Sequence, residues 1–366
     1  MVIVEGLEKA FQTDQGQVRA IQGISFRVKE AEFFTLLGPS GCGKTTALRC
    51  IAGLEKAEEG KIILGGVTVF SARENLFVPP NHRDIGMVFQ SYAIWPHMNV
   101  FENVAFPLMQ GEKRFSKSQI KEKVEKALSM VRLDGLQKRS APQLSGGQQQ
   151  RLALARALVK EPKVLLLDEP LSNLDAKLRE EMRIELKDLV KKFRITTVYV
   201  THDQLEALAL SDIVAIMKNG QIVQVSGPKE LYYSPQSKFI AQFIGTANLF
   251  EGEVAKEASP EGLGRVKIKQ GLLSCTLSQG LKKSEKVAVL VRPENIEISK
   301  ARPVSSENVI EGRVERVIFL GDFLDCQILA TDQLVRIKLH PTFSVEEGEK
   351  VFIKISPEFC TVMSLD

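Results

Sequence analysis

The sequence feature that most constrains the fold is a glycine-rich stretch, GPSGCGKTT, that runs from Gly38 to Thr46. It follows the apolar run Phe33 to Leu37 and precedes a segment of helical period, and its spacing fits GxxxxGK[ST]. Glycines allow backbone N–H groups to turn towards a phosphate, and the N-terminus of the next helix adds positive potential. The stretch therefore predicts a phosphate-binding loop in an α/β fold. The residues expected to bind the nucleotide are Gly38, Ser40, Gly41, Cys42, Gly43, Lys44, Thr45 and Thr46.

Two residues of this loop are expected to carry the chemistry of a nucleotide site. Lys44 would reach the β- and γ-phosphates, and the hydroxyl of Thr45 would ligate Mg²⁺. By itself the loop predicts only nucleotide binding, so kinases, GTPases and helicases all remain open at this point.

Composition excludes several classes of protein. The 49 basic and 45 acidic residues of the 366-residue chain are interleaved, which does not indicate a nucleic-acid partner. No run approaches the roughly 20 apolar residues of a membrane-spanning helix, and the start MVIVEGLEKAF lacks the pattern of a secretory signal. The five cysteines form no CxxC pair, so we expect reduced packing thiols in a cytosolic protein.

The length predicts two domains. Residues 1–243 alternate short β-branched runs with helical segments, which predicts an α/β P-loop NTPase with a RecA-like core, an antiparallel β piece and a helical insert at about 100–158. Residues 244–366 show short strands bounded by Gly, Pro, Ser and Asn, which predicts a small all-β barrel of the OB-like kind.

A second chemical motif is KVLLLDEP, in which an apolar strand ends at Asp168 and Glu169. The C-terminal ends of strands are where open α/β sheets bind ligands. Asp168 suits coordination of Mg²⁺, directly or through water, and Glu169 suits a base that polarises the attacking water. Two acidic residues that merely end a strand are the alternative interpretation.

The segment LSGGQQQRLALARAL lies between these motifs, and its Ser145, Gly146 and Gly147 open a predicted helix. Small residues at a helix N-terminus form a second site that suits an anion. A serine cap ahead of an ordinary helix is the alternative for these three residues alone.

Together these stretches resemble the ATPase subunits of ABC transporters, whose signature motif is LSGGQ. The resemblance continues with Gln90 in GMVFQSYAIWPHM, similar to the family's Q-loop, with SNLD at Ser172 to Asp175, similar to the D-loop, and with His202 in YVTHD, similar to the switch histidine. All six motifs occur in the family's order.

The resemblance implies a head-to-tail dimer with two ATP molecules between the subunits. One subunit would supply Lys44, Thr45, Gln90, Asp168, Glu169 and His202 to each ATP, and the other would supply Ser145, Gly146, Gly147 and Gln148. Glu169, His202, Gln90 and Lys44 would be the catalytic residues, and Thr45, Gln90 and Asp168 would hold Mg²⁺. Phe11 resembles the aromatic residue that stacks on adenine, although a packing role is equally compatible with its position.

The resemblance also implies partners and a location. The chain would work as a dimer at the cytoplasmic face of the inner membrane, beneath two permease subunits. A separate solute-binding protein would deliver the solute to these permeases, and no nucleic acid would take part. The apolar segment Tyr92 to Met109 resembles the part of the family that receives the permease, and we expect some of it to form the core of the helical insert instead. The second domain, including VRPENIEI at Val291 to Ile298, resembles the regulatory barrel of maltose-, polyamine- and ferric-iron-type importers, which favours import.

Among solutes, the stretches AIWPHM and FIGTANLF favour ferric iron or a polyamine over a sugar, although a sugar importer stays an alternative.

Two other classes of protein also stay open. One is a soluble ABC ATPase that acts on nucleic acid or ribosomes, and the other is a P-loop kinase. The single cassette and the absence of a heptad run argue against the first, and LSGGQ argues against the second.

Overall fold

A computed structural model of the chain describes residues 1–14, 16–110, 114–259, 262–277, 280–304 and 307–365. Its contacts divide the chain into two compact units, Met1–Pro228 and Lys229–Asp366. The fold is the predicted one, a mixed α/β unit followed by an all-β unit that carries two short helices.

A six-stranded sheet in the order β11-β10-β3-β9-β8-β7 forms the centre of the first unit. Five of these strands are parallel, and β11 is antiparallel at the edge. Every residue of β3, β8 and β9 is buried, as expected for strands covered on both faces. The bounds are β3 Phe33–Leu37, β7 Ile85–Val88, β8 Val164–Asp168, β9 Thr196–Thr201, β10 Ile213–Lys218 and β11 Gln221–Ser226.

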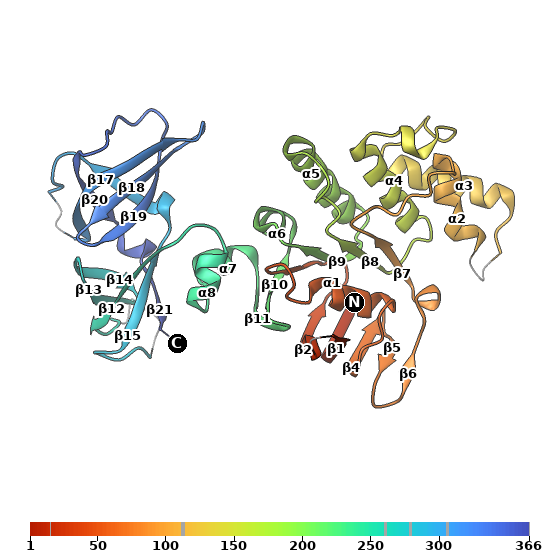
Figure 1. Cartoon of the computed structure of the whole chain (residues 1–366), viewed down its shortest axis with the longest axis horizontal. Helices are drawn as coiled ribbons and strands as arrows, with labels where there is room; N and C mark the ends of the chain where they lie inside the picture. The colour runs from red at the N-terminus through yellow and green to blue at the C-terminus, as the bar shows by residue number, and fades with distance from the viewer. Residues whose placement is uncertain (15, 111–113, 260–261, 278–279, 305–306, 366) are drawn as a thin grey trace. The chain divides into compact units, whose positions relative to one another are not determined.

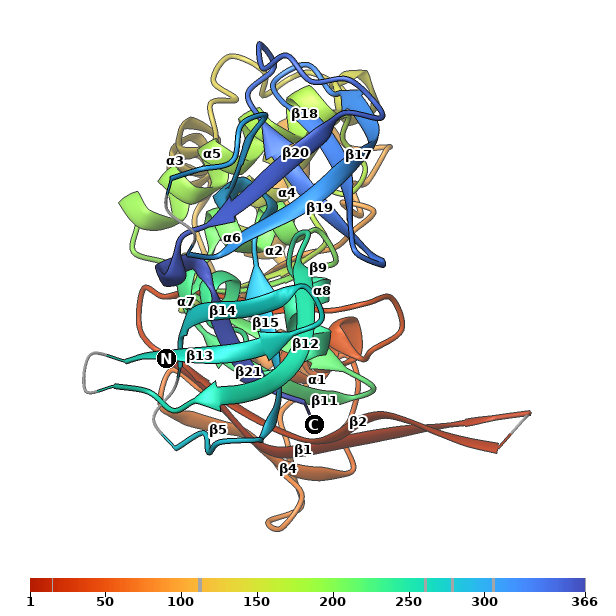
Figure 2. The same ribbon diagram turned by 90° about the vertical axis from the view of Figure 1, so that its left-hand side faces the viewer.

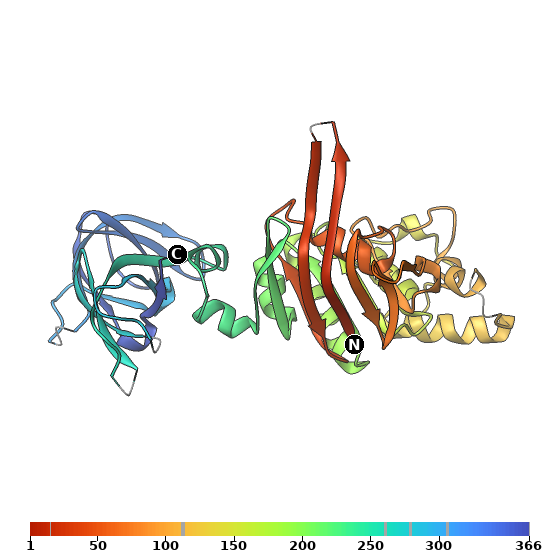
Figure 3. The same ribbon diagram turned by 90° about the horizontal axis from the view of Figure 1, so that it is seen from below.

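A second, antiparallel sheet in the order β2-β1-β4-β5-β6 packs over one face of the central sheet, with helix α1 (Lys44–Ala52) between the two (Figure 1). Figure 3 shows that the far end of the β1–β2 hairpin extends well beyond the neighbouring strands. The bounds are β1 Val2–Thr13, β2 Gly16–Val28, β4 Glu59–Leu64, β5 Val67–Ser71 and β6 Leu76–Phe77.

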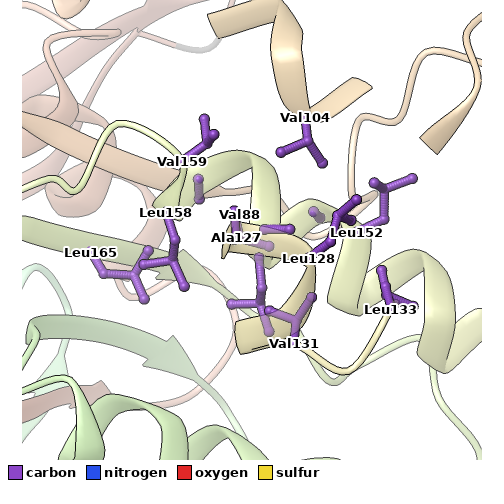
Figure 4. Close-up of a cluster of buried hydrophobic side chains, with 14 of the residues drawn as sticks. Val88, Val104, Ala127, Leu128, Val131, Leu133, Leu152, Leu158, Val159 and Leu165 are labelled. Atoms are coloured by element: carbon purple, nitrogen blue, oxygen red, sulfur yellow. The ribbon is translucent and has the colours of Figure 1, made fainter. Parts of the chain in front are cut away.

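Helices cover the opposite face of the central sheet. Their shared core receives side chains from β7, α2, α3, α4 and β8, among them Val88, Val104, Leu128, Leu152 and Leu165 (Figure 4). Each of α2, α3 and α4 begins with a reciprocal capping box, which satisfies backbone donors that a helix start leaves open. The bounds are α2 Val100–Met109, α3 Lys117–Met130, α4 Gly146–Leu158, α5 Ala176–Lys192 and α6 Gln204–Leu210.

None of the helices in the described parts of the chain combines the length and the apolar character needed to cross a bilayer. The five cysteines are all buried free thiols, which confirms the predicted packing role.

The second unit contains a closed barrel, β12-β13-β14-β21-β15, and a five-stranded sheet, β16-β20-β17-β18-β19, which share one hydrophobic core. Figure 2 shows β12, β13 and β14 curving around the barrel. The sequence predicted a single small barrel, so the second sheet is an addition to that prediction. The bounds are α7 Pro228–Tyr233, α8 Lys238–Phe243, β12 Asn248–Lys256, β13 Leu263–Ile268, β14 Gly271–Thr276, β15 Lys286–Val291, β16 Ile296–Ser299, β17 Val309–Phe319, β18 Leu324–Ala330, β19 Gln333–Leu339, β20 Lys350–Ile355 and β21 Thr361–Ser364.

Arg292 explains why α7 and α8 belong to the second unit, ahead of the predicted boundary between residues 243 and 244. Its buried guanidinium donates hydrogen bonds to the carbonyls of Tyr232, Ala241 and Ile244, at 2.6 to 3.1 Å for the shortest bond to each. The guanidinium also lies 4.0 Å from the centre of the Tyr232 ring. One side chain that follows β15 therefore fastens the ends of both helices to the barrel.

Arg83 similarly fastens the helix that follows the phosphate-binding loop, α1. Its guanidinium donates to the carbonyls of Cys50 and Ile51 at 2.8 and 2.7 Å, at the C-terminal end of α1. Gly53, at φ 80°, leaves the room that this side chain needs, because a Cβ there would lie 2.6 Å from Nε of Arg83. Burial lowers the pKa of Arg83 to about 10, so it stays charged at neutral pH.

We expect Arg83→Met to lower the free energy of unfolding of the first unit by about 3 kcal/mol, because it leaves buried carbonyls without donors. Urea unfolding followed by circular dichroism measures the change. Arg73→Met, at an exposed arginine, is the matched control and should change stability by less than about 0.5 kcal/mol. Equal effects of the two substitutions would contradict the role given to Arg83.

Candidate functional site

The glycine-rich loop joins β3 to α1 and depends on two glycines for its path. A Cβ on Gly43 would lie 2.2 Å from the carbonyl oxygen of Ala20, and one on Gly38 would lie 2.2 Å from that of Met217. Gly43 also has φ 103°, which L side chains rarely adopt. The loop can follow this path only because both positions lack a side chain. Within it Ser40 and Gly41 are exposed, Cys42 is buried, and Thr45 and Thr46 are half-buried.

Lys44 is buried at the start of α1, and its ammonium faces the loop itself. Nζ donates hydrogen bonds to the carbonyls of Gly38 and Pro39 at 2.7 and 2.9 Å. A positive charge is therefore held directly beneath the turn whose backbone is expected to contact phosphates.

Asp168 ends β8 beside the first turn of α1, where its Oδ1 accepts a hydrogen bond of 2.9 Å from the Thr45 hydroxyl. The carboxyl is 5% exposed, and this burial raises its pKa, while the bond from Thr45 and the charge of Arg49 partly offset the rise. A hydroxyl and a carboxylate oxygen side by side are the oxygen donors that Mg²⁺ prefers.

Glu169 lies next to Asp168 and brings two other predicted residues together. Its Oε2 accepts a hydrogen bond of 3.2 Å from Nε2 of Gln90 and lies 3.1 Å from Nδ1 of His202. The backbone of Glu169 has φ 44°, and its N–H donates to the carbonyl of Val200 in β9. The strand ends thus place a carboxylate, an amide and an imidazole around one point.

The Ser145 to Gln148 turn forms the exposed start of α4. The Ser145 hydroxyl accepts a hydrogen bond from the N–H of Gln148, and the Gln148 side chain accepts one from the N–H of Ser145. Gly147 is buried, and a Cβ there would lie 3.1 Å from a methyl of Leu178. The first turn of the helix therefore presents Ser145 and Gly146 to solvent while it packs against the start of α5.

Phe11 lies apart from these groups, on the β1–β2 hairpin, where it pairs with Val18 and is half-buried. The ammonium of Lys9 lies 4.9 Å from the centre of its ring. A partly open aromatic face is available at this position, and its role in adenine binding stays a prediction.

Two residues that support the site were missed at the sequence level. Arg156 donates to the carbonyls of Tyr92 and Ala93, each at 2.5 Å, and the Asn173 amide donates to the carbonyl of Gln90 at 2.8 Å. An arginine among the alanines and leucines of LALARAL is a signal for a buried, structural charge. Nothing comparable distinguishes Asn173 within SNLD.

Comparisons with known proteins identify the family of this chain. A family model described as ABC transporter matches residues 21–172, and one described as TOBE domain matches residues 289–363. Curated relatives are 42% and 46% identical over 95% and 97% of the chain. The chain therefore belongs to the ATP-binding subunits of ABC transporters, in the importer group with a C-terminal TOBE domain. It is an ATPase of the kind coupled to transport, as the sequence predicted.

Relatives from three organisms carry the same name, spermidine/putrescine import ATP-binding protein PotA. The protein of Acetivibrio thermocellus is 46% identical over 97% of this chain and 95% of its own length. Those of Clostridioides difficile and Thermotoga maritima are 42% and 45% identical, over 95% and 87% of this chain and 94% and 84% of their own lengths.

Solved structures of similar fold include MJ0796, described as a bacterial ABC transporter cassette in a dimeric structure. It is 30% identical, with a TM-score of 0.54, over 62% of this chain and 99% of its own. A second structure of MJ0796, in a post-hydrolysis state with bound ADP and Pi, is 31% identical with the same TM-score, over 62% of this chain and 99% of its own. The ATPase fold and ATP binding are therefore properties of this chain as well.

Lys44→Ala should lower the affinity for ATP at least tenfold, because it removes charge-assisted hydrogen bonds worth about 1.5 to 3 kcal/mol each. Isothermal titration calorimetry with a non-hydrolysable ATP analogue measures the change. The control is Lys56→Ala, at an exposed lysine just beyond α1. An affinity within twofold of the original would remove Lys44 from the phosphate site.

Proposed function

We propose that this chain hydrolyses Mg·ATP to drive polyamine import through partner permeases. The sequence left ferric iron and polyamines as the favoured solutes, with a sugar as the alternative. Relatives named for spermidine and putrescine import align over nearly the whole chain at 42% to 46% identity, which favours polyamines. In this proposal the first unit hydrolyses ATP and so supplies the energy for transport. The second unit, which contains the residues that match the TOBE domain, regulates the transporter.

The observation that carries the proposal is the convergence of six side chains from four separate segments of the chain. Lys44 would hold the β- and γ-phosphates, and Thr45 with Asp168 would hold Mg²⁺, with Gln90 as a further ligand. The bound ion would neutralise phosphate charge. Glu169 already lies against Gln90 and His202, so the residues that would orient the attacking water and contact the γ-phosphate are in reach of one another.

The Ser145 to Gln148 turn supports the dimer part of the proposal. The exposed residues Ser145 and Gly146 and the positive end of α4 suit a phosphate that approaches from outside the subunit. In a head-to-tail dimer this turn would face the ATP bound by the partner copy. The dimeric structure of the similar cassette MJ0796 supports that arrangement.

A groove of about 850 Å³ on the helical insert supports docking of a permease. Phe101, Met109 and Ile120 line it with apolar surface, and lysines and Glu125 are among its other lining residues. Met109 is 56% exposed and lies in the same groove as Phe101 and Ile120, and an apolar patch of several residues marks an interaction site where a single exposed residue would not. Together with the predicted permease segment Tyr92 to Met109, the groove favours work at the cytoplasmic face of the inner membrane, where a solute-binding protein would deliver the cargo to the complex.

Glu169→Gln should keep ATP binding and lower turnover at least about 100-fold, because the amide cannot act as a base. ATP should then hold the variant as a dimer, which light scattering after size exclusion measures. Glu180→Gln, at an exposed position of α5, is the control. Rapid hydrolysis by the Glu169 variant would assign the base elsewhere.

The solute is tested in vesicles that contain the chain with its permease subunits and solute-binding protein. Spermidine or putrescine should raise ATP hydrolysis several-fold and accumulate inside the vesicles. Ferric iron and maltose, supplied in the same way, should do neither. Stimulation by iron or maltose alone would overturn the polyamine assignment.

A further inference from the structure

The segment Gln90–Ala93, which we call the Gln90 segment, leaves β7 and runs to the helical insert in an unfavourable backbone conformation. Tyr92 and Ala93 have φ of 61° and 47°, which for non-glycine residues costs about 1 kcal/mol each. Contacts outside the segment must therefore hold it in place. Two of the contacts that hold its backbone lie at its two ends.

The first contact fixes the segment to α4. The guanidinium of Arg156 donates to the carbonyls of Tyr92 and Ala93 and lies 4.6 Å from the centre of the Trp95 ring. Arg156 is 9% exposed, and burial lowers its pKa to about 10, so both bonds come from a buried charge. Bonds of this kind are about twice as strong as neutral ones.

The second contact fixes the segment to the catalytic side. The Asn173 amide donates a single neutral hydrogen bond of 2.8 Å to the carbonyl of Gln90, at an exposed position. Gln90 thus has its backbone held by Asn173 and its side chain held against Glu169. An exposed neutral bond is the weaker of the two anchors.

Asn173 belongs to a short segment that is itself firmly placed. The hydroxyl of Ser172 donates to the carbonyl of Glu169 at 2.9 Å, and the guanidinium of Arg179 donates to that of Leu174 at 2.9 Å. Leu174 and Leu178 lie against Gly146 and Gly147, where a Cβ would be 3.6 and 3.1 Å away. The position of the Asn173 amide is therefore fixed relative to both Glu169 and the first turn of α4.

We propose that Asn173 is a positioning residue for ATP hydrolysis: its amide fixes where Gln90 stands relative to Glu169. The buried charge of Arg156 holds the far end of the Gln90 segment on α4, so the neutral, exposed bond from Asn173 is the weaker of the two and the one expected to break first. The inference rests on the roles proposed above for Gln90 and Glu169.

Two variants of the full-length chain distinguish the effect of losing the hydrogen bond from the effect of changing the size of the side chain. Asn173→Ala removes the amide, and Asn173→Asp keeps the size while replacing the donor with a carboxylate that a carbonyl repels. Asn173→Gln retains a donor and is the conservative variant. Asn81→Ala, in the 3-10 helix Pro80–His82, is the matched control at an exposed asparagine.

Hydrogen–deuterium exchange of the peptide that covers residues 89–98, without nucleotide, gives the readout that catalysis does not affect. We expect exchange there to rise about three- to tenfold in the Ala and Asp variants, the change expected for one lost hydrogen bond. ATPase kcat should fall by a similar factor while KM for ATP stays within twofold. The Gln variant should recover part of both effects.

Unchanged exchange in the Ala and Asp variants would overturn the proposal, and so would raised exchange with an unchanged kcat. Gln90→Ala distinguishes the second result from a failure of the proposed site. If Gln90→Ala is impaired while Asn173→Ala is fully active, Asn173 does not position Gln90. If Gln90→Ala is itself fully active, the role proposed for Gln90 fails first.

Discussion

The pairing of three parallel strands, β3, β9 and β8, is the constraint on which the rest of this molecule depends. Leu37 at the end of β3 pairs with Thr201, and Asp168 at the end of β8 pairs with Val200. The residues that follow these strand ends therefore meet at one edge of the sheet. A shift of one residue in either pairing would exchange the side chains that pack on the two covered faces of the sheet, and a shift between β8 and β9 would separate Glu169 from His202. Burial of all three strands on both faces keeps the register fixed.

Much of this site could be predicted because its parts are local patterns. A glycine loop between an apolar strand and a helix, a strand that ends in two carboxylates, and a serine ahead of two glycines each need only a few neighbouring residues. The contacts between these parts could not be predicted in the same way. Arg156 is separated from Ala93 by 63 residues and Asn173 from Gln90 by 83, and no periodic pattern connects such distant positions.

The second unit shows the same limit in its fold. Alternating apolar residues identified most of its strands, since alternation depends on one chain segment at a time. The alternation of apolar residues does not specify which strands pair with one another. β12 pairs with β15 as well as with β13, and β14 meets β21 near the end of the chain, so closure of the barrel joins segments that are far apart in sequence. The additional sheet and the attachment of α7 and α8 by Arg292 follow from such distant pairings.

The hydrogen bonds of Lys44 have a consequence for the entropy of binding. Its ammonium donates to two carbonyls of its own loop, so one side chain holds the turn and the positive charge in a fixed relation. A loop that is ordered in this way has little conformational freedom left to lose when a phosphate binds. A nucleotide therefore meets a loop whose shape is already set.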